Sequence, residues 1–151
     1  MINSRFGELH HRAAAGELFS WRETALGSLA EVIVLDQFSR NIHRNRPEAF
    51  VNDGLALALS QFAIFQKLDT QLSAIERVFL YMPFMHSESA VIHEEAVTLF
   101  ESVGLQSNLE FELRHKAIID RFGRYPHRNK ILGRPSTEEE IQFLKQPGSG
   151  F

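Results

Sequence analysis

Apolar residues recur along much of the chain with the period of an α-helix. Ile75, Val78, Phe79 and Met82 lie at positions i, i+3, i+4 and i+7, which places them on one helix face. The residues that flank such segments often show the S-x-x-E spacing of a helix-starting capping box. Four such spacings occur, at Ser20/Glu23, Ser73/Glu76, Ser107/Glu110 and Ser136/Glu139. The pattern therefore predicts an all-α protein.

Helix-breaking residues predict where these helices end. Pro83 is expected to end one helix, and Gly104 and Gly123 are expected to follow two others. Residues 32–35 and 55–59 are ambiguous by period, but each continues without a breaker into a longer apolar segment, so we assign both to helices. The predicted helices lie near 3–15, 24–38, 50–66, 74–82, 88–103, 108–122 and 137–145. Their short connections predict antiparallel helical hairpins in a single helical domain that spans residues 1–151.

Composition fits a folded protein of this kind. The chain has 151 residues, of which 44% are hydrophobic and 23% charged, which is ordinary for a globular domain. No apolar run approaches the roughly 20 residues that cross a bilayer, so no membrane association is expected. The absence of cysteine excludes disulfides and thiolate chemistry and suits a reducing compartment. We therefore expect a cytoplasmic location.

Charge is distributed unevenly along the chain. The formal net charge is −3, which argues against nucleic-acid binding by the chain as a whole. Residues 114–134 nevertheless contain seven Lys or Arg and one acid, Asp120. Arginine also outnumbers lysine by 12 to 4, and its guanidinium suits bidentate contacts with carboxylate or phosphate. The basic segment is therefore interpreted either as an anion site or as a set of structural ion pairs.

Several histidines occupy positions where chemistry is conceivable. His115 shares a helical stripe with apolar residues, which fits either a neutral core histidine or a general acid or base. Ser87 and Glu88 are explained by capping of the next helix, whereas His86 beside them is not. His127 lies in a loop between Arg124 and Arg128 that leaves a helix end through a glycine.

The sequence lacks the standard motifs for cofactor binding and offers only weak spacings for a metal site. No P-loop, G-x-S-x-G, G-x-G-x-x-G or H-E-x-x-H is present, so the cofactor stays unknown. Two Glu-x-x-His spacings, Glu8/His11 and Glu112/His115, are about as frequent as chance allows in a chain with this many Glu and His residues. We therefore expect no metal site.

Four motifs together resemble one known family. They are residues 35–41 (LDQFSRN), 77–88 (RVFLYMPFMHSE), 121–129 (RFGRYPHRN) and 132–137 (LGRPST). Over nearly the whole chain, the sequence is similar to the bacterial domain of unknown function 924 family. The resemblance implies an all-helical, tetratricopeptide-repeat-like α-α superhelix and no established activity.

The resemblance also selects candidate site residues. His93 stands where the similar sequences tend to have Gln, which favours a structural role for it. The residues on motif positions are expected to form one site, and they are Asp36, Gln37, Arg40, Asn41, Arg77, His86, Glu88, His115, Arg124, His127 and Arg128.

Two functions compete at this point. The first is a helical binding module that uses four arginines to hold an anionic small molecule or a peptide carboxylate, namely Arg40, Arg77, Arg124 and Arg128. The alternative is an enzyme, a hydrolase or transferase for a phosphate- or carboxylate-bearing molecule, in which His86, His115 or His127 works with Glu88 or Asp36. In either case we predict that the helix near 24–38, the helix near 74–82 and the loop 123–129 meet in one partly buried polar cluster.

A final expectation concerns the first residues. The similar sequences usually carry a further aromatic-rich segment ahead of the position that matches Phe6. Without that segment, an apolar patch is expected at Phe6, Leu9, Leu18, Phe19 and Trp21. Such a patch usually marks an interface, which predicts a homodimer, unless the first helix folds back over the patch.

Overall fold

The computed structural model describes residues 2–151, with side chains described from residue 5 onward. Over this range the chain forms α-helices, short 3-10 turns and one π-helical turn, and no strand. The α-helices are α1 (Ile2–Ala14), α2 (Ala25–Ile33), α3 (Ser39–Ile42), α4 (Asp53–Phe65), α5 (Ala74–His86), α6 (Ala90–Val103), α7 (Gln106–Phe122), α8 (Asn129–Leu132) and α9 (Glu138–Leu144). The predicted all-α class is confirmed.

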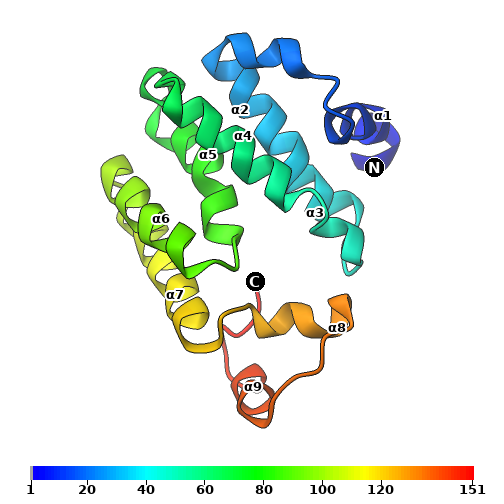
Figure 1. The fold of residues 1–151 in the computed structure, drawn as a ribbon, viewed down its shortest axis with the longest axis vertical. Coiled ribbons are helices and arrows are strands. Elements are labelled where there is room, and N and C mark those ends of the chain that lie inside the picture. Colours follow the sequence, from blue (N-terminus) through cyan, green and yellow to red (C-terminus); the bar gives the residue numbers. More distant parts are fainter. Residues whose placement is uncertain (1) are drawn as a thin grey trace.

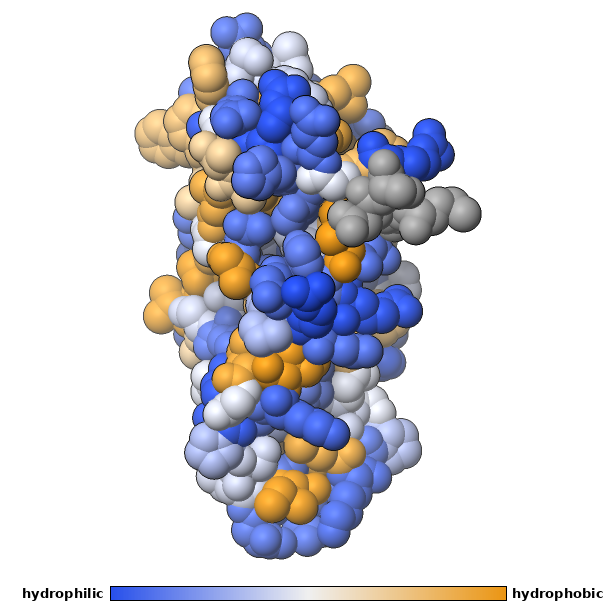
Figure 2. Space-filling model, turned by 90° about the vertical axis from the view of Figure 1, so that its right-hand side faces the viewer, coloured by the Kyte–Doolittle hydropathy of each residue, from blue (hydrophilic) through white to orange (hydrophobic). Residues whose placement is uncertain are grey.

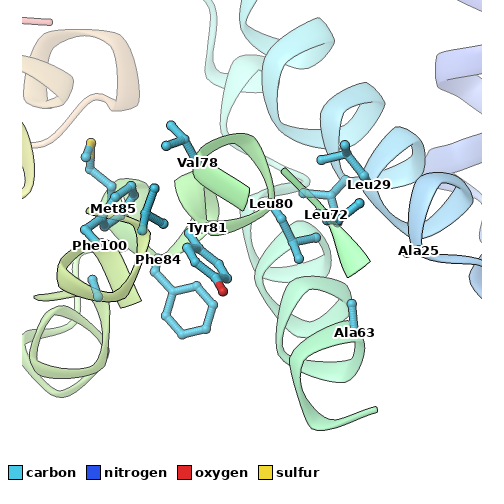
Figure 3. Packing of buried hydrophobic residues seen from close by; sticks show 13 residues of the cluster. Ala25, Leu29, Ala63, Leu72, Val78, Leu80, Tyr81, Phe84, Met85 and Phe100 are labelled. Atoms are coloured by element: carbon cyan, nitrogen blue, oxygen red, sulfur yellow. The ribbon is translucent and has the colours of Figure 1, made fainter. Parts of the chain in front are cut away.

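The longer helices pack as successive neighbours. Helix α4 packs against α2 and α5, α5 against α6, and α6 against α7, as Figure 1 shows. Their buried faces form the largest hydrophobic cluster, in which Leu80, Tyr81 and Phe100 are almost completely shielded from solvent (Figure 3). The helices after α7 form a separate lower part of the molecule in Figure 1 and have their own small cluster around Ile119 and Tyr125. The hairpin prediction is confirmed for α4 to α7, whereas the tetratricopeptide-like superhelix stays a prediction.

A π-helical turn interrupts the helix that was expected near 24–38. Helix α2 begins at the cap residue Thr24, whose hydroxyl accepts the Gly27 N–H at 3.0 Å, and it passes into the π-turn Val34–Phe38 before α3. A π-turn inserts one residue into the helical repeat and is common at functional sites. Here the turn carries Asp36 and Gln37, and Asp36 is buried with 1% exposure. The π-turn therefore places the carboxylate of Asp36 in the protein interior.

Helix α5 does not end at Pro83 as predicted but continues to His86. Pro83 lacks an N–H and so weakens the helical bonding of the preceding turn. The carbonyl of Leu80 in that turn accepts a hydrogen bond from the buried Ser60 hydroxyl of α4 at 2.5 Å. This contact joins α5 to α4 at the turn before the proline. Because the helix continues past Pro83, His86 lies on its last turn rather than in a loop.

Of the four predicted capping boxes, one is confirmed, one is displaced and two are wrong. The Ser73/Glu76 box is confirmed, with both reciprocal bonds formed at the start of α5. The expected box at Ser136/Glu139 is displaced by one residue to Thr137/Glu140. The other two expectations are wrong, because residues 19–23 form a 3-10 turn and Ser107 lies inside α7 after an uncapped start at Leu105.

The first helix covers most of the apolar residues that were expected to be exposed. Leu18 is buried, and Leu9 and Trp21 pack against the cluster around Leu35. Phe6 stacks on Phe38 with ring centroids 5.2 Å apart. Of the five residues, Phe19 alone is largely exposed, at 67%. These five residues therefore do not form the predicted exposed patch. The homodimer stays a prediction that the patch no longer supports.

None of the described helices combines the length and apolar character needed to cross a membrane.

Candidate functional site

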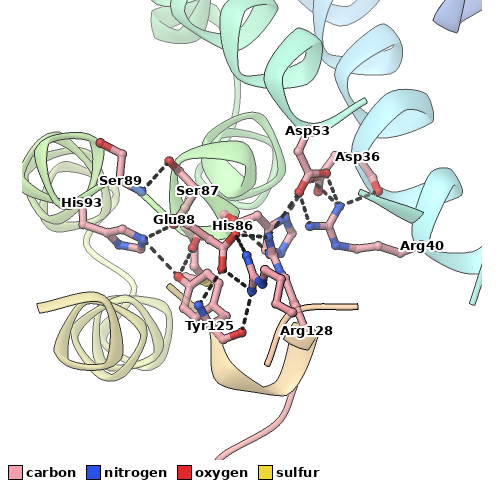
Figure 4. Close-up of polar contacts among 12 residues, drawn as sticks. Asp36, Arg40, Asp53, His86, Ser87, Glu88, Ser89, His93, Tyr125 and Arg128 are labelled. Carbon is pink, nitrogen blue, oxygen red and sulfur yellow. Dashed lines mark hydrogen bonds and ion pairs between the residues drawn. The ribbon is translucent and has the colours of Figure 1, made fainter. Parts of the chain in front are cut away.

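A buried aspartate and a histidine form the centre of the candidate site. His86 Nδ1 lies 2.7 Å from Asp36 Oδ1, and the Asp36 side chain is 1% exposed (Figure 4). Burial alone would raise the pKa of Asp36, but the neighbouring His86 and Arg40 lower the pKa below its ordinary value. An ionised carboxylate only accepts hydrogen bonds, so the His86 Nδ1–H donates. This arrangement fixes the imidazole and leaves Nε2 as its free nitrogen.

Arg40 connects this pair to the first turn of α4. Its guanidinium binds both carboxylate oxygens of Asp53, at 2.8 and 3.0 Å, and also reaches Asp36 Oδ1 at 3.2 Å. Burial opposes the charge of Arg40, yet the bonds to Asp53 and Asp36 outweigh it and raise its pKa. Gln37 supplies a further donor to Asp36, at 2.7 Å. Asp36 is therefore held on both oxygens by side chains from three elements.

Arg128 occupies the space between two carboxylates without a close bond to either. Its Nη1 lies 3.7 Å from Asp53 and 4.0 Å from Glu88, while its Nη2 donates to the His86 carbonyl at 2.9 Å. The Nε of Arg128 is buried and has no hydrogen-bond partner. Burial prevails over the neighbouring acids and lowers the pKa of Arg128. Unlike Arg40, Arg128 therefore keeps unused hydrogen-bonding capacity.

Glu88 connects the α5–α6 turn to the loop after α7. Its Oε2 accepts the Tyr125 backbone N–H at 2.6 Å, and both oxygens bind the Arg134 guanidinium at 2.9 and 3.0 Å. Burial tends to raise the pKa of Glu88, but Arg134 and the Tyr125 amide lower it below the ordinary value. Glu88 is thus ionised and bound by the protein itself.

These groups line a cavity of about 420 Å³. His86, Asp53, Glu88 and Arg128 contribute its charged wall, and the remaining wall is largely apolar, from Pro47, Phe50, Val51, Leu57, Pro83 and Leu132. A concave site with apolar walls and a few convergent polar groups is typical of small-molecule binding.

A second cavity of about 700 Å³ lies on the other side of Phe50, which lines both. Its lining is basic or neutral and comprises Gln37, Arg40, Asn41, Arg44, Asn45, Ala49, Phe50, His127, Ile131 and Phe151. Figure 2 shows this side of the molecule, where a hydrophilic area at the level of α3 lies directly above a hydrophobic one. Of the predicted site residues, Gln37, Arg40, Asn41 and His127 therefore line this second cavity.

His93 has a structural role, as expected from the resemblance. It is fully buried, and its Nε2–H donates to the Ser87 carbonyl at 2.7 Å. Its Nδ1 lies 2.5 Å from Glu112 Oε1, and burial raises the pKa of Glu112. Tyr125 completes this group through its hydroxyl, which donates to the Met85 carbonyl at 2.5 Å. The group joins α5, α6, α7 and the following loop beneath the site.

His115 is buried, and its ring is neutral near pH 7. Its Nδ1–H donates to the Phe111 carbonyl at 2.6 Å, and burial lowers its pKa to about 4. The ring packs against Tyr125 and Phe151 instead of lining the first cavity. Among the described contacts, therefore, His115 makes none with Asp36 or Glu88.

The lowered pKa of His115 predicts acid-sensitive stability. The unfolded chain binds a proton near pH 6.5 that the folded chain takes up only near pH 4, so the free energy of unfolding falls as the pH drops between these values. His115 alone is expected to remove about 2 kcal/mol between pH 7.5 and pH 5. Urea unfolding at both pH values measures the loss, which should shrink by this amount in His115→Gln. The same change at the exposed His11 should leave the loss unchanged.

The structure brings most, but not all, of the predicted residues together. Asp36, Arg40, His86, Glu88 and Arg128 converge as predicted. Two arginines lie elsewhere, so their predicted convergence is wrong. Arg77 stands on the first turn of α5, nine residues before His86, next to Tyr81. Arg124 binds both carboxylate oxygens of Glu140 at 2.8 and 2.9 Å and fastens α9 to the loop.

The basic segment of residues 114–134 is largely neutralised by acids. Five of its seven cations form ion pairs, namely Lys116, Arg121, Arg124, Arg128 and Arg134. Four of the acids lie outside the segment, at Asp53, Glu88, Glu139 and Glu140, which local sequence does not reveal. The structural-ion-pair interpretation of this segment is therefore the better one.

Three site residues were missed by the sequence reasoning. In the sequence, Asp53 is already explained as an acid in the first turn of α4, where it interacts favourably with the helix dipole. Tyr125 and Arg134 lie inside quoted motifs but carry no local sign of a role. Their roles depend on partners 46 residues away for Arg134 and 37 for Tyr125.

Among the described residues, no group of three or more His, Cys, Asp or Glu side chains is placed to hold a metal ion.

Comparisons with known proteins agree with the motif resemblance. A family described as "Bacterial protein of unknown function (DUF924)" matches residues 1–148. A solved structure of a protein of unknown function from Agrobacterium tumefaciens is 40% identical, with a TM-score of 0.91 over 95% of this chain and 81% of that chain. A search of curated proteins found no match. The chain belongs to the DUF924 family of bacterial proteins of unknown function.

Proposed function

We propose that the protein is an enzyme in which His86 acts as the general base. The observation that carries this proposal is the Asp36–His86 contact of 2.7 Å at the wall of a cavity. A buried carboxylate on Nδ1 fixes the ring and its tautomer and stabilises the imidazolium that forms when Nε2 takes a proton. Nε2 is the nitrogen left to remove a proton from water or from a substrate hydroxyl.

Arg128 is the group suited to the charge that develops on the substrate. It lines the same cavity, and its buried Nε lacks a partner. A guanidinium with unused donors binds carboxylate or phosphoryl oxygens well. Glu88 and Asp53 are already bound to Arg134 and Arg40, so they position Arg128 and do not compete as bases. These features favour hydrolysis or group transfer on a carboxylate or phosphate ester.

The rest of the cavity limits the substrate. Its volume of about 420 Å³ suits a small molecule, and its apolar side, which includes Phe50 and Leu57, suits a hydrocarbon or aromatic portion. We therefore assign a small ester with one apolar group as the substrate class.

Hydrolysis of a panel of 4-nitrophenyl carboxylate esters, phosphate monoesters and phosphate diesters tests this proposal. At least one class should be hydrolysed, and His86→Gln should lower its rate about 100-fold or more, because general-base catalysis typically contributes 10² to 10⁴. The matched control is His11→Gln on the exposed face of α1, which should keep the wild-type rate. Equal rates in wild type and His86→Gln, or no hydrolysis of any class, would argue for the second function below.

The second function is a binding module for an anionic small molecule or a peptide carboxylate. The second cavity favours it, because its ten lining residues include two arginines and no carboxylate. The predicted four-arginine surface is reduced to Arg40 and Arg128, since Arg77 and Arg124 have other positions. A tetratricopeptide-like concave face is part of this second proposal.

A further inference from the structure

The ring of Phe151 forms part of the wall of the second cavity and is seated among three other rings. The Phe151 centroid lies 3.9 Å from that of His115, 4.3 Å from that of His127 and 5.0 Å from that of Tyr125. The segment before it runs from α9 back to the middle of the molecule, as Figure 1 shows. Phe151 nevertheless remains 54% exposed. An aromatic side chain thus occupies a cradle without being buried in it.

The cradle holds polar groups that Phe151 does not satisfy. His127 Nδ1 is buried and has no hydrogen-bond partner. Burial, reinforced by the charge of Arg128, lowers the pKa of His127 to about 4, so its ring is neutral near pH 7. A neutral imidazole has one donor and one acceptor nitrogen, which suits a heterocyclic ring better than a phenyl ring.

Cationic and amide groups lie beside the cradle in the same cavity. Arg44 is exposed and forms no ion pair within the described part of the chain, unlike Arg40, which is bound to Asp53. Asn41, three residues before Arg44, and Asn45, directly after it, also line the cavity. The side chains that line the cavity include two arginines and no Asp or Glu, which favours an anionic ligand.

We propose that this cavity binds a small anionic molecule that carries a planar ring, with the ring in the place of Phe151 and the anionic group on Arg44. The ring would pack on His115, Tyr125 and His127, and Phe50 separates it from the His86 cavity. Nucleoside monophosphates and aromatic carboxylates share this chemistry. The proposal is independent of catalysis by His86.

Isothermal titration calorimetry with four probes tests the site. AMP and phenylacetate represent the two sources of a ring with an anion, and adenosine and inorganic phosphate supply the ring or the anion alone. AMP or phenylacetate should bind the protein more tightly than either half-probe. Arg44→Ala should weaken this binding about tenfold, since charge-assisted hydrogen bonds are strong. Arg46→Ala, an exposed arginine two residues further on that does not line the cavity, is the matched control and should have no effect.

The Phe151→Ala variant tests whether the ring of the ligand displaces the Phe151 ring or whether the anion is only attracted to the charged surface. Removal of the competing ring should tighten binding about three- to tenfold, as expected for the loss of an aromatic contact that the ligand must replace. Shifts of the His115 and His127 ring signals in an NMR titration should accompany binding. Weaker binding in Phe151→Ala, equal binding in Arg44→Ala and wild type, or no binding of either ring-bearing anion to any variant would overturn the proposal. His86→Gln should bind AMP or phenylacetate as the wild type does. The binding proposal and the catalytic proposal can therefore fail independently.

Discussion

Replacement of Glu88 by Ala is expected to lower the free energy of unfolding by about 3 kcal/mol. Glu88 accepts three hydrogen bonds, one from the Tyr125 amide and two from the Arg134 guanidinium. Its removal leaves the Tyr125 N–H unpaired, deprives Arg134 of its carboxylate partner and takes away one of the two acids that flank Arg128. Unpaired buried donors and charges cost far more than a lost surface ion pair.

Urea unfolding measures this effect, with Glu101→Ala as the control. Glu101 is an exposed glutamate on α6, so its replacement should change stability by less than 0.5 kcal/mol, as is usual for surface positions. Amide exchange should also rise in residues 124–145 of Glu88→Ala more than in α4 and α5, because Glu88 is the acid that joins the α5–α6 turn to that part of the chain. A loss below 1 kcal/mol would show that Glu88 does not hold the loop.

Helix identity was predictable because apolar period and helix breakers are local properties. All seven predicted helices exist, and most of their ends lie within two residues of the predicted positions. The errors arise where these local rules do not decide. Helix α5 continues past Pro83 to His86, and the π-turn at residues 34–38 follows no apolar period. The short α8 (Asn129–Leu132) was missed, since four residues carry no measurable period.

The candidate site was predictable in part for a related reason. The resemblance selected Asp36, His86 and Glu88, but it could not say which groups pair. The partner of Arg124 is Glu140, 16 residues away, so an arginine that looked available for an anion is bound to the protein. Arg44 was not among the predicted site residues, yet it has no ion pair within the described residues. Availability of a cation is a property of the packed structure and not of its local sequence.

The Asp36–His86 pair leads to the other large expected effect. Asp36→Asn keeps the volume of the side chain but removes its charge, so Arg40 loses one of its two carboxylates and the His86 Nδ1–H loses an anionic acceptor. Breaking a buried, hydrogen-bonded ion pair costs about 3 kcal/mol or more. The amide can also donate to Nδ1, which moves the ring proton to Nε2 and removes the free base. Any hydrolysis that depends on His86 should then fall by about 10² to 10⁴.

Two measurements separate this role of Asp36 from a merely structural one. Long-range ¹H–¹⁵N spectra near pH 8 should show His86 with its proton on Nδ1 in the wild type and on Nε2, or divided between the nitrogens, in Asp36→Asn. Glu48→Gln is the control, because Glu48 is an exposed acid that pairs with Arg46 at 3.5 Å and should change neither the tautomer nor the stability. An unchanged tautomer together with wild-type hydrolysis in Asp36→Asn would contradict the proposed base. Loss of stability alone would show that Asp36 serves only to hold Arg40 and the π-turn in place.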